Sequence, residues 1–92
     1  MTVFHPGHHE LHGVTVVLEA RNAQTYVGRF DSQDEHGVHL LDVGVHQGGG
    51  EQSREDYLKR TLKYGVRAEH KHVLVPTGDV VGIARLADVA TA

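Results

Sequence analysis

The sequence of 92 residues lacks cysteine, and this absence excludes disulfide frameworks, thiolate zinc sites and cysteine nucleophiles. Apolar runs are also short, none longer than four residues, so the chain offers no candidate for a membrane span. No basic stretch followed by an apolar one opens the sequence, and no secretory signal is therefore expected. These absences favour a soluble protein with a cytoplasmic location.

The composition indicates one small domain of 10.1 kDa over residues 1–92. Valine supplies 14 residues, leucine 8 and isoleucine 1, enough for a modest core but not for a large substrate cleft. The formal net charge is −3 with neutral histidine, and it becomes +6 when all nine histidines are protonated. The charge of the chain therefore changes sign in the range where histidine titrates.

Apolar and polar residues alternate with a period of two along most of the chain, which is typical of strands with one solvent-exposed face. In the first such segment Val16 and Leu18 are expected to point inward and Val17 to face solvent. A glycine within the second segment, Gly28, indicates a bend or a bulge. Strands are expected near residues 14–19, 25–30, 38–46, 72–76 and 80–86. Five short strands and tight turns predict a mainly β fold, a small closed antiparallel barrel rather than a sandwich.

Residues 53–65 break the alternation and have the features of a helix. Ser53 can cap its first turn, which is rich in acidic residues, and Gly65 can end it. Leu58 and Leu62 are four residues apart and would share one face. The alternative is one arm of a long hairpin, because part of this segment also alternates. We expect the helix.

Three further segments complete the expected organisation. Residues 47–71, which include this helix, form a variable insertion before the fourth strand. Residues 1–12 are expected to contain a short helical segment, and residues 87–92 a plain tail.

Four short stretches, taken in order, carry a family resemblance. They are Leu11-x-Gly13-x-x-Val16, Tyr26-x-Gly28-x-Phe30-x-x-x-Asp34, Val38-x-Leu40, and Val73-Leu74-Val75 followed by Val80-Val81-x-Ile83. In this order and with these gaps, the chain resembles the Sm-like (LSm) domain family of bacterial or archaeal type. The resemblance implies a strongly bent, five-stranded, SH3-like barrel that assembles into a ring and binds RNA.

The resemblance also implies where RNA would bind. In the family, the loop before the third strand carries an aspartate, a stacking ring and an asparagine that reads a base edge, and an arginine before the last strand packs near the base. Asp34 and His36 match the aspartate and the ring, but Gly37 follows and no asparagine does. Pro76-Thr77 stands where the family has an Arg-Gly pair. The implied site, Asp34, His36 and Gly37, should bind RNA weakly and with little base preference.

Basic residues are concentrated between Arg54 and Lys71, where six of the nine occur with two tyrosines among them. Basic side chains contact nucleic-acid backbones and tyrosines stack on bases, so Lys59, Arg60 and Lys63 are further candidate RNA contacts. The alternative is an amphipathic insertion with solvated charges, which the acidic balance of the whole chain favours.

Histidine is enriched near the N-terminus, where four lie within eight residues: His5, His8, His9 and His12. On a helix His8 and His12 would share a face, and neutral imidazoles so placed can bind zinc, nickel or copper. The alternative is a polar segment whose histidines face solvent. Chelator-sensitive metal content would distinguish the two.

The last two expected strands are short and apolar, and exposed strand edges aggregate unless a neighbour covers them. We therefore expect a ring of five to seven copies, as the resemblance implies, closed through Val73, Leu74, Val75, Val80, Val81 and Ile83. His39, His70 and His72 would line a pore or a subunit edge in such a ring, or else remain ordinary exposed strand positions.

No set of residues indicates catalysis. Neither serine lies in a nucleophile motif, the acidic residues at 31–35 suit turn hydrogen bonding, and the glycine run at 48–50 lacks the lysine of a phosphate loop. We expect a protein that is not an enzyme and needs no cofactor or membrane. The leading hypothesis is a ring-forming Sm-like protein with weak RNA binding. The alternatives are an oligomeric scaffold without RNA binding and a histidine-based metal-binding protein.

Overall fold

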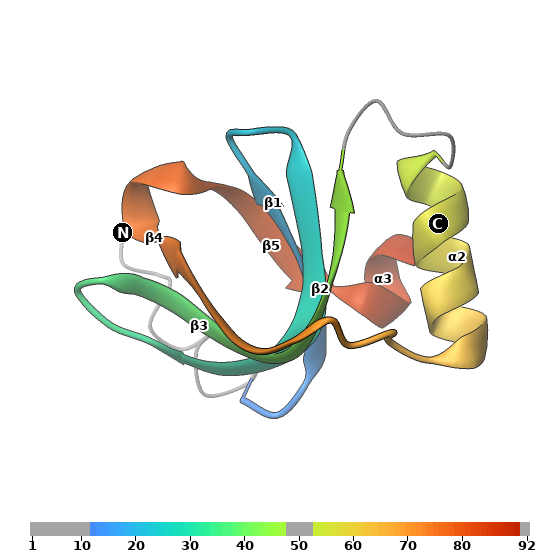
Figure 1. Cartoon of the computed structure of the whole chain (residues 1–92), viewed down its shortest axis with the longest axis horizontal. Helices are drawn as coiled ribbons and strands as arrows, with labels where there is room; N and C mark the ends of the chain where they lie inside the picture. Colours follow the sequence, from blue (N-terminus) through green and yellow to red (C-terminus); the bar gives the residue numbers. More distant parts are fainter. Residues whose placement is uncertain (1–11, 48–52, 91–92) are drawn as a thin grey trace.

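Five strands and two α-helices form the part of the chain that the computed structural model describes, residues 12–47 and 53–90 (Figure 1). In chain order the elements are β1 (Thr15–Ala20), β2 (Gln24–Gln33), β3 (Gly37–Gln47), α2 (Arg54–Tyr64), β4 (His70–Pro76), the 3-10 turn η1 (Thr77–Asp79), β5 (Val80–Arg85) and α3 (Leu86–Ala90). All five expected strands are confirmed, although β2 and β4 are longer than their sequence patterns indicate. None of the helices in this described part is long and apolar enough to cross a membrane.

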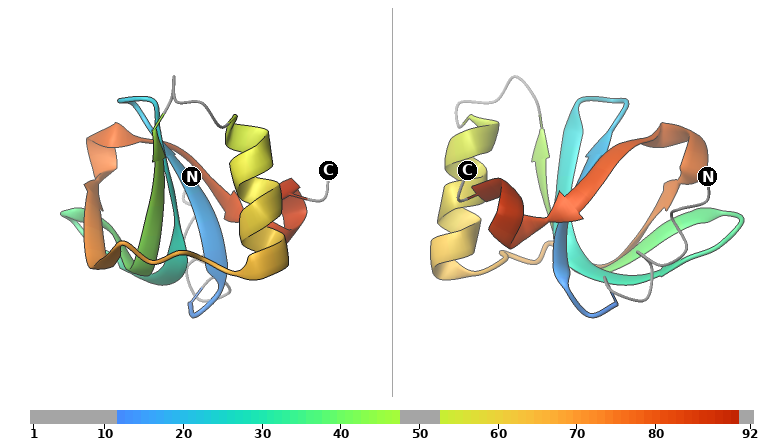
Figure 2. Two further views of the ribbon diagram at one scale, coloured as in Figure 1. Left: turned by 45° about the vertical axis from the view of Figure 1, so that its right-hand side comes forward. Right: turned by 180° about the vertical axis from the view of Figure 1, so that it is seen from behind.

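The strands form one antiparallel sheet in the order β4-β3-β2-β1-β5. The sheet is strongly bent, and its two ends curl toward each other (Figures 1 and 2). Among the described residues, β4 pairs only with β3 and β5 pairs only with β1. The barrel is therefore open between β4 and β5, which corrects the closed barrel expected from the sequence.

The bend of β2 depends on a glycine. The register between β2 and β3 shifts between Val27 and Arg29, which is the mark of a bulge. Gly28 lies at this shift, and a Cβ atom there would lie 2.9 Å from the Leu41 carbonyl oxygen and 2.9 Å from Val43 Cγ2. Gly28 thus occupies a position with no space for a side chain, as its place in the sequence pattern predicted.

The sheet buries side chains on both of its faces. The inner face packs a core inside the bend, made of Val16, Leu18, Ala20, Phe30, Val38, Leu40, Val43 and Val75. The outer face packs a second core in which Val17 and Val27 contact Leu58 of α2 and Leu86 of α3. Val17 is 2% exposed, so the prediction that it faces solvent was wrong. Two helices that are distant in sequence cover its side of the sheet (Figure 1).

Helix α2 confirms the helix expected at residues 53–65. The backbone N–H of Asp56 donates to Ser53 Oγ at 3.1 Å, which satisfies one free donor of the first turn. At the other end Gly65 adopts φ of 94°, and its N–H donates to the Thr61 carbonyl at 2.8 Å. Leu58 is buried against the sheet, so this part of the insertion belongs to the core of the domain.

The C-terminal segment differs from the expected tail. The chain leaves β5 at Arg85 and forms α3, in which Leu86 is buried and Val89 packs on the second core. Arg85 and Asp88, one helical turn apart, form an ion pair across the junction of β5 and α3, with Arg85 Nε 2.8 Å from Asp88 Oδ2. The helix forms because Leu86 gains a buried position on the outer face of the sheet. The helical segment expected within residues 1–12 lies outside the described residues except for His12.

Candidate functional site

The loop between β2 and β3 holds three of the predicted RNA-binding residues together: Asp34, His36 and Gly37. The Asp34 N–H donates to the Gly37 carbonyl at 3.0 Å, and the Gly37 N–H donates back to the Asp34 carbonyl at 3.2 Å. Asp34 Oδ1 also accepts hydrogen bonds from the N–H groups of His36, at 2.8 Å, and Gly37, at 3.2 Å. Asp34 therefore fixes the backbone on both sides of His36.

These hydrogen bonds also determine the ionisation of Asp34. The N–H of His36 is the main cause that holds the pKa of the Asp34 carboxyl below its ordinary value of 3.8, and the His39 side chain is the next. Hydrogen bonds to a carboxylate stabilise its charged form. Asp34 is therefore an anion at neutral pH, and the geometry of the loop depends on that anion.

Gly37 brings the loop against the end of β4. Its φ of 148° is one that residues with a side chain rarely adopt, and a Cβ atom there would lie 2.1 Å from the Val75 carbonyl oxygen. Gly37 is paired with Pro76 across β3 and β4. The loop that carries His36 and the start of the β4–β5 connection consequently lie side by side.

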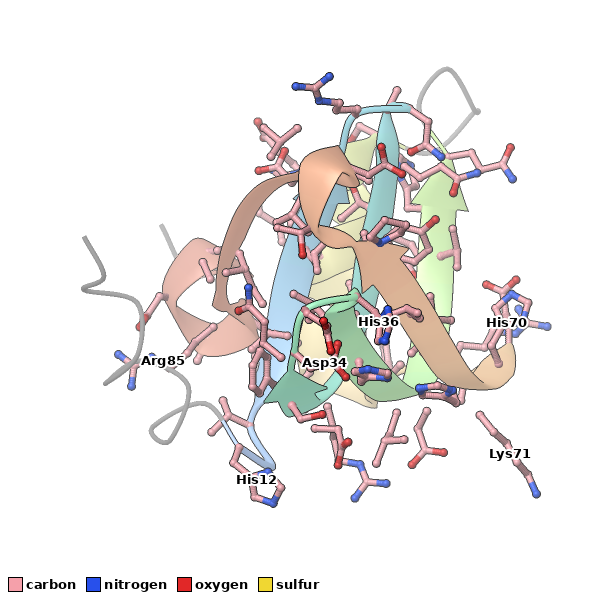
Figure 3. The ribbon with its side chains drawn as sticks, turned by 90° about the vertical axis from the view of Figure 1, so that its left-hand side faces the viewer. His12, Asp34, His36, His70, Lys71 and Arg85 are labelled. Atoms are coloured by element: carbon pink, nitrogen blue, oxygen red, sulfur yellow. The ribbon has the colours of Figure 1, made fainter. Side chains whose placement is uncertain are left out.

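His36 presents its imidazole to solvent at the tip of this loop (Figure 3). In the described part of the chain, the contact recorded for His36 is the backbone hydrogen bond to Asp34, and its ring has no hydrogen bond or ion pair. A fixed backbone with a free exposed ring is an arrangement suited to stacking on a planar group.

Two further histidines extend the site along the sheet. His39 Nε2 lies 2.9 Å from Asp34 Oδ2, and His39 Nδ1 lies 2.9 Å from His72 Nε2. A carboxylate only accepts, so Nε2 of His39 carries the proton, and in a neutral ring Nδ1 accepts from His72. The two ring planes differ by 8° with centroids 5.1 Å apart, as expected for rings joined edge to edge through an N···N hydrogen bond. The network connects the loop, β3 and β4.

The sequence placed His39 and His72 on strands but did not place them in contact. His39 is paired with Leu74, so His72 is its diagonal neighbour on the same face. This contact follows from the β3–β4 register, and nothing in the residue pattern specifies a register that joins two residues 33 positions apart in the chain.

The remaining predicted RNA contacts lie elsewhere. Lys59, Arg60 and Lys63 are exposed on α2. Helix α2 and the β2–β3 loop are at opposite ends of the long axis of the molecule, which measures 36 Å (Figure 1). Within one chain the structure therefore does not bring these cations to Asp34 and His36.

The residues predicted to join neighbouring subunits lie on both sides of the edge strands. Val75 is buried, and Val73, Val80 and Ile83 pack partly against the inner core of their own chain. Leu74 on β4 and Val81 on β5 are exposed, at 41% and 67%. Each edge strand thus offers one large apolar side chain and one row of backbone groups that has no strand partner in the described sheet.

The predicted metal site is only partly visible. His5, His8 and His9 lie outside the described residues. His12 donates through Nδ1 to the Asp31 carbonyl at 2.7 Å and holds the entry to β1 against β2. No group of three or more histidine, aspartate or glutamate residues in the described ranges is arranged to hold a metal ion. Metal binding by the N-terminal histidines stays a prediction.

Comparison with known proteins shows what the chain is similar to. No protein-family model matches the sequence, and no curated protein matches it. Among solved structures, it is similar to the Sm protein of Pyrococcus abyssii, solved in complex with a uridine heptamer, with a TM-score of 0.59 and 18% identity. The alignment covers 84% of this chain and 89% of that one. At this identity the likeness shows the fold, and it confirms the Sm-like fold expected from the sequence motifs.

Proposed function

We propose that the protein assembles into a ring of five to seven copies through its β4 and β5 edges and binds single-stranded RNA weakly at the β2–β3 loop. The observation that carries the proposal is the exposed ring of His36 on a loop whose backbone Asp34 fixes with two hydrogen bonds. The proposed ring-shaped oligomer would present one such loop per subunit.

The state of the edge strands supports assembly. A sheet edge with unpaired backbone groups pairs readily with another chain. The two edges of this sheet are different, one formed by β4 and the other by β5, so their pairing joins copies head to tail and can close into a ring. Leu74 and Val81 add apolar surface at these edges.

The chemistry of the loop supports binding with little base preference. Stacking a base on an aromatic side chain contributes about 1–3 kcal/mol and does not depend strongly on which base it is. Base identity is read by hydrogen bonds to base edges. Neither Gly37 nor its partner Pro76 has a side chain that can donate or accept such a bond. We therefore propose that uridine, adenine and cytosine bind with similar affinity.

A second candidate is an oligomeric scaffold that does not bind RNA. The same two residues favour it, because Gly37 and Pro76 leave the loop without the base-reading groups that the family resemblance implies. Native mass spectrometry with and without a mixed oligonucleotide pool separates the two candidates. Rings that bind oligonucleotide support RNA binding, and rings that ignore the pool support the scaffold. A stable monomer at micromolar concentration would contradict both.

The role of His36 is tested by fluorescence anisotropy with labelled oligo-U, oligo-A and oligo-C. His36→Ala should weaken binding by roughly 5- to 150-fold, the equivalent of one stacked base. His70→Ala is the matched control, because His70 is an exposed histidine on β4 that lies apart from the loop (Figure 3). Tight, uridine-selective binding that is unchanged in His36→Ala would overturn the proposal.

A further inference from the structure

The outer side of α2 and the segment that follows it gather four cations and an exposed aromatic ring, here named the α2 cationic face: Lys59, Arg60, Lys63, Tyr64 and Arg67. All five residues are exposed, and Tyr64 is 72% exposed, an unusual state for a large aromatic side chain. This face lies at the end of the molecule that carries α2, away from the β2–β3 loop (Figures 1 and 2).

The spacing of these residues and the packing of the helix hold the face in place. Lys59 and Lys63, like Arg60 and Tyr64, are four residues apart and lie on adjacent positions of the helix surface. Leu58 and Thr61, on the other side, are buried. The helix is thus anchored on the sheet through its buried side, and its cations point away from the domain.

The charges on this face are not neutralised by neighbours. The ion pairs recorded in the described residues involve Arg29, His39, Arg54 and Arg85, and none involves a cation of the α2 cationic face. Glu55 and Asp56 lie one turn before Lys59 and Arg60, and neither acid is in one of these ion pairs. A chain with a net charge of −3 therefore presents a local positive surface, which a polyanion complements.

The shape of the face suits a strand of nucleotides. Two shallow hollows adjoin there, one of about 330 Å³ and one of about 460 Å³, and both are lined by Arg60 and Tyr64. Lys63 Nζ lies over the Tyr64 ring, 5.3 Å from its centroid, so one face of the ring carries a cation that can contact a phosphate beside a base stacked on Tyr64. Cations that follow a backbone beside an aromatic platform are the arrangement by which proteins hold single strands.

We propose that the α2 cationic face is a second surface for single-stranded RNA, in which Lys59, Arg60, Lys63 and Arg67 contact phosphates and Tyr64 stacks on a base. The choice of RNA as the polymer rests on the proposed function, whereas the residues and their location are independent of His36. An acidic peptide would satisfy the cations, but it would leave the exposed ring of Tyr64 without a planar partner.

The experiment compares two variants of equal composition by fluorescence anisotropy with a labelled RNA of mixed sequence. Arg60→Gln with Lys63→Gln removes two cations from the face. Arg21→Gln with Lys71→Gln, the matched control, removes one arginine and one lysine from exposed positions outside α2. For the first variant, the slope of log Kd against log salt concentration should decrease by about 1.4, the value for two phosphate contacts on a single strand. The control should keep the wild-type slope.

The stacking role is tested with Tyr64→Leu, which keeps an apolar side chain on the helix. It should weaken binding by roughly 5- to 150-fold. In the double variant with His36→Ala the two fold-changes should multiply, because α2 and the β2–β3 loop lie at opposite ends of the molecule (Figure 1). Circular dichroism at the assay temperature verifies that every variant is folded.

The possible outcomes separate this proposal from the proposed function. Loss of binding in the α2 variants with none in His36→Ala supports the α2 cationic face and contradicts the loop site. Loss of binding in His36→Ala with none in the α2 variants contradicts the α2 cationic face and leaves the loop site standing. Equal salt slopes for the two double variants would overturn the α2 cationic face as an RNA site. Competition with poly-glutamate, added at the same charge concentration as the RNA, gives a second test. If poly-glutamate displaces RNA from the wild type but not from the Arg60→Gln, Lys63→Gln variant, the face binds acidic peptides and the proposal is overturned.

Discussion

The substitution Gly37→Ala tests whether the β2–β3 loop depends on a backbone position that only glycine can occupy. The φ of 148° is strained for any residue with a side chain, at a cost of about 1–3 kcal/mol. The new Cβ would also lie 2.1 Å from the Val75 oxygen and 2.8 Å from the Val75 carbonyl carbon. Both are backbone atoms, so no rotamer change relieves the overlap, and Gly37 and Pro76 must move apart. We expect a total loss of about 3 kcal/mol or more.

This loss is large for the size of the chain. A domain of 92 residues has a free energy of unfolding of about 5–14 kcal/mol, and 3 kcal/mol would lower its melting temperature by roughly 12–24 °C. Urea unfolding followed by circular dichroism measures it directly. All proteins are compared at one concentration, because the proposed self-association would be linked to folding.

Gly78→Ala is the matched control for this measurement. Gly78 lies in η1, its φ is outside the left-handed region, and no atom lies within 4 Å of the position its Cβ would take. This change should alter stability by less than about 1 kcal/mol, in the direction of a gain, because alanine restricts the unfolded chain. Equal urea midpoints for Gly37→Ala and Gly78→Ala would refute the reasoning about the loop.

Three further substitutions test the bend, the second core and the charge of the loop. Gly28→Val should lower the free energy of unfolding by about 2 kcal/mol or more, because a Cβ atom there would lie 2.9 Å from a backbone oxygen. Gly82→Val is the control, because no atom lies within 4 Å of the position its Cβ would take. Equal melting temperatures for the two variants would contradict the role of Gly28 in the bend. Leu58→Ala should lower the free energy of unfolding in urea by about 2–5 kcal/mol, because Leu58 is buried. Leu62→Ala should lower it clearly less, because the Leu62 side chain is 42% exposed. Similar losses for the two variants would mean that α2 is not part of the core. Hydrogen bonds lower the folded pKa of Asp34, so the stabilisation by its charged form is complete above its ordinary pKa of 3.8 and is lost as pH falls through the folded pKa. The difference in melting temperature between wild type and Asp34→Asn should therefore shrink below about pH 4. A difference that stays constant with pH would argue against an ionic role of Asp34.

The strands were predictable because their signal is local. Alternation within a few residues assigned Val16 and Leu18 to the inner core, and this assignment is confirmed. The same alternation assigned Val17 to solvent and was wrong, because what covers Val17 is α2 and α3, which lie far away in the sequence. A local pattern shows that a strand has two different faces, and it does not show whether a distant segment covers the second one.

The candidate site was predictable to a similar extent. The motif around Asp34 identified the loop, since an aspartate that caps its own turn acts on residues two and three positions away. The contact between His39 and His72 was not predictable, because it needs the register of two strands separated by the whole insertion. The location of the α2 cations could not be derived either, because a run of charges identifies an exposed helix side without stating which part of the domain it faces.

Helix α2 packs on the outer face of the sheet and leaves the edge strands and the β2–β3 loop uncovered by the second core. The helix packs through Leu58 on Val17 and Val27, which belong to the inner strands β1 and β2. Among the described residues, the second core includes none from the edge strands β4 and β5, so α2 leaves both edges to the pairing proposed above. The β2–β3 loop, at the other end of the molecule, is equally untouched (Figure 1). Helix α2 thus adds a charged surface to the protein and stabilises the sheet by burying its outer face, while Asp34 and His36 keep their exposure.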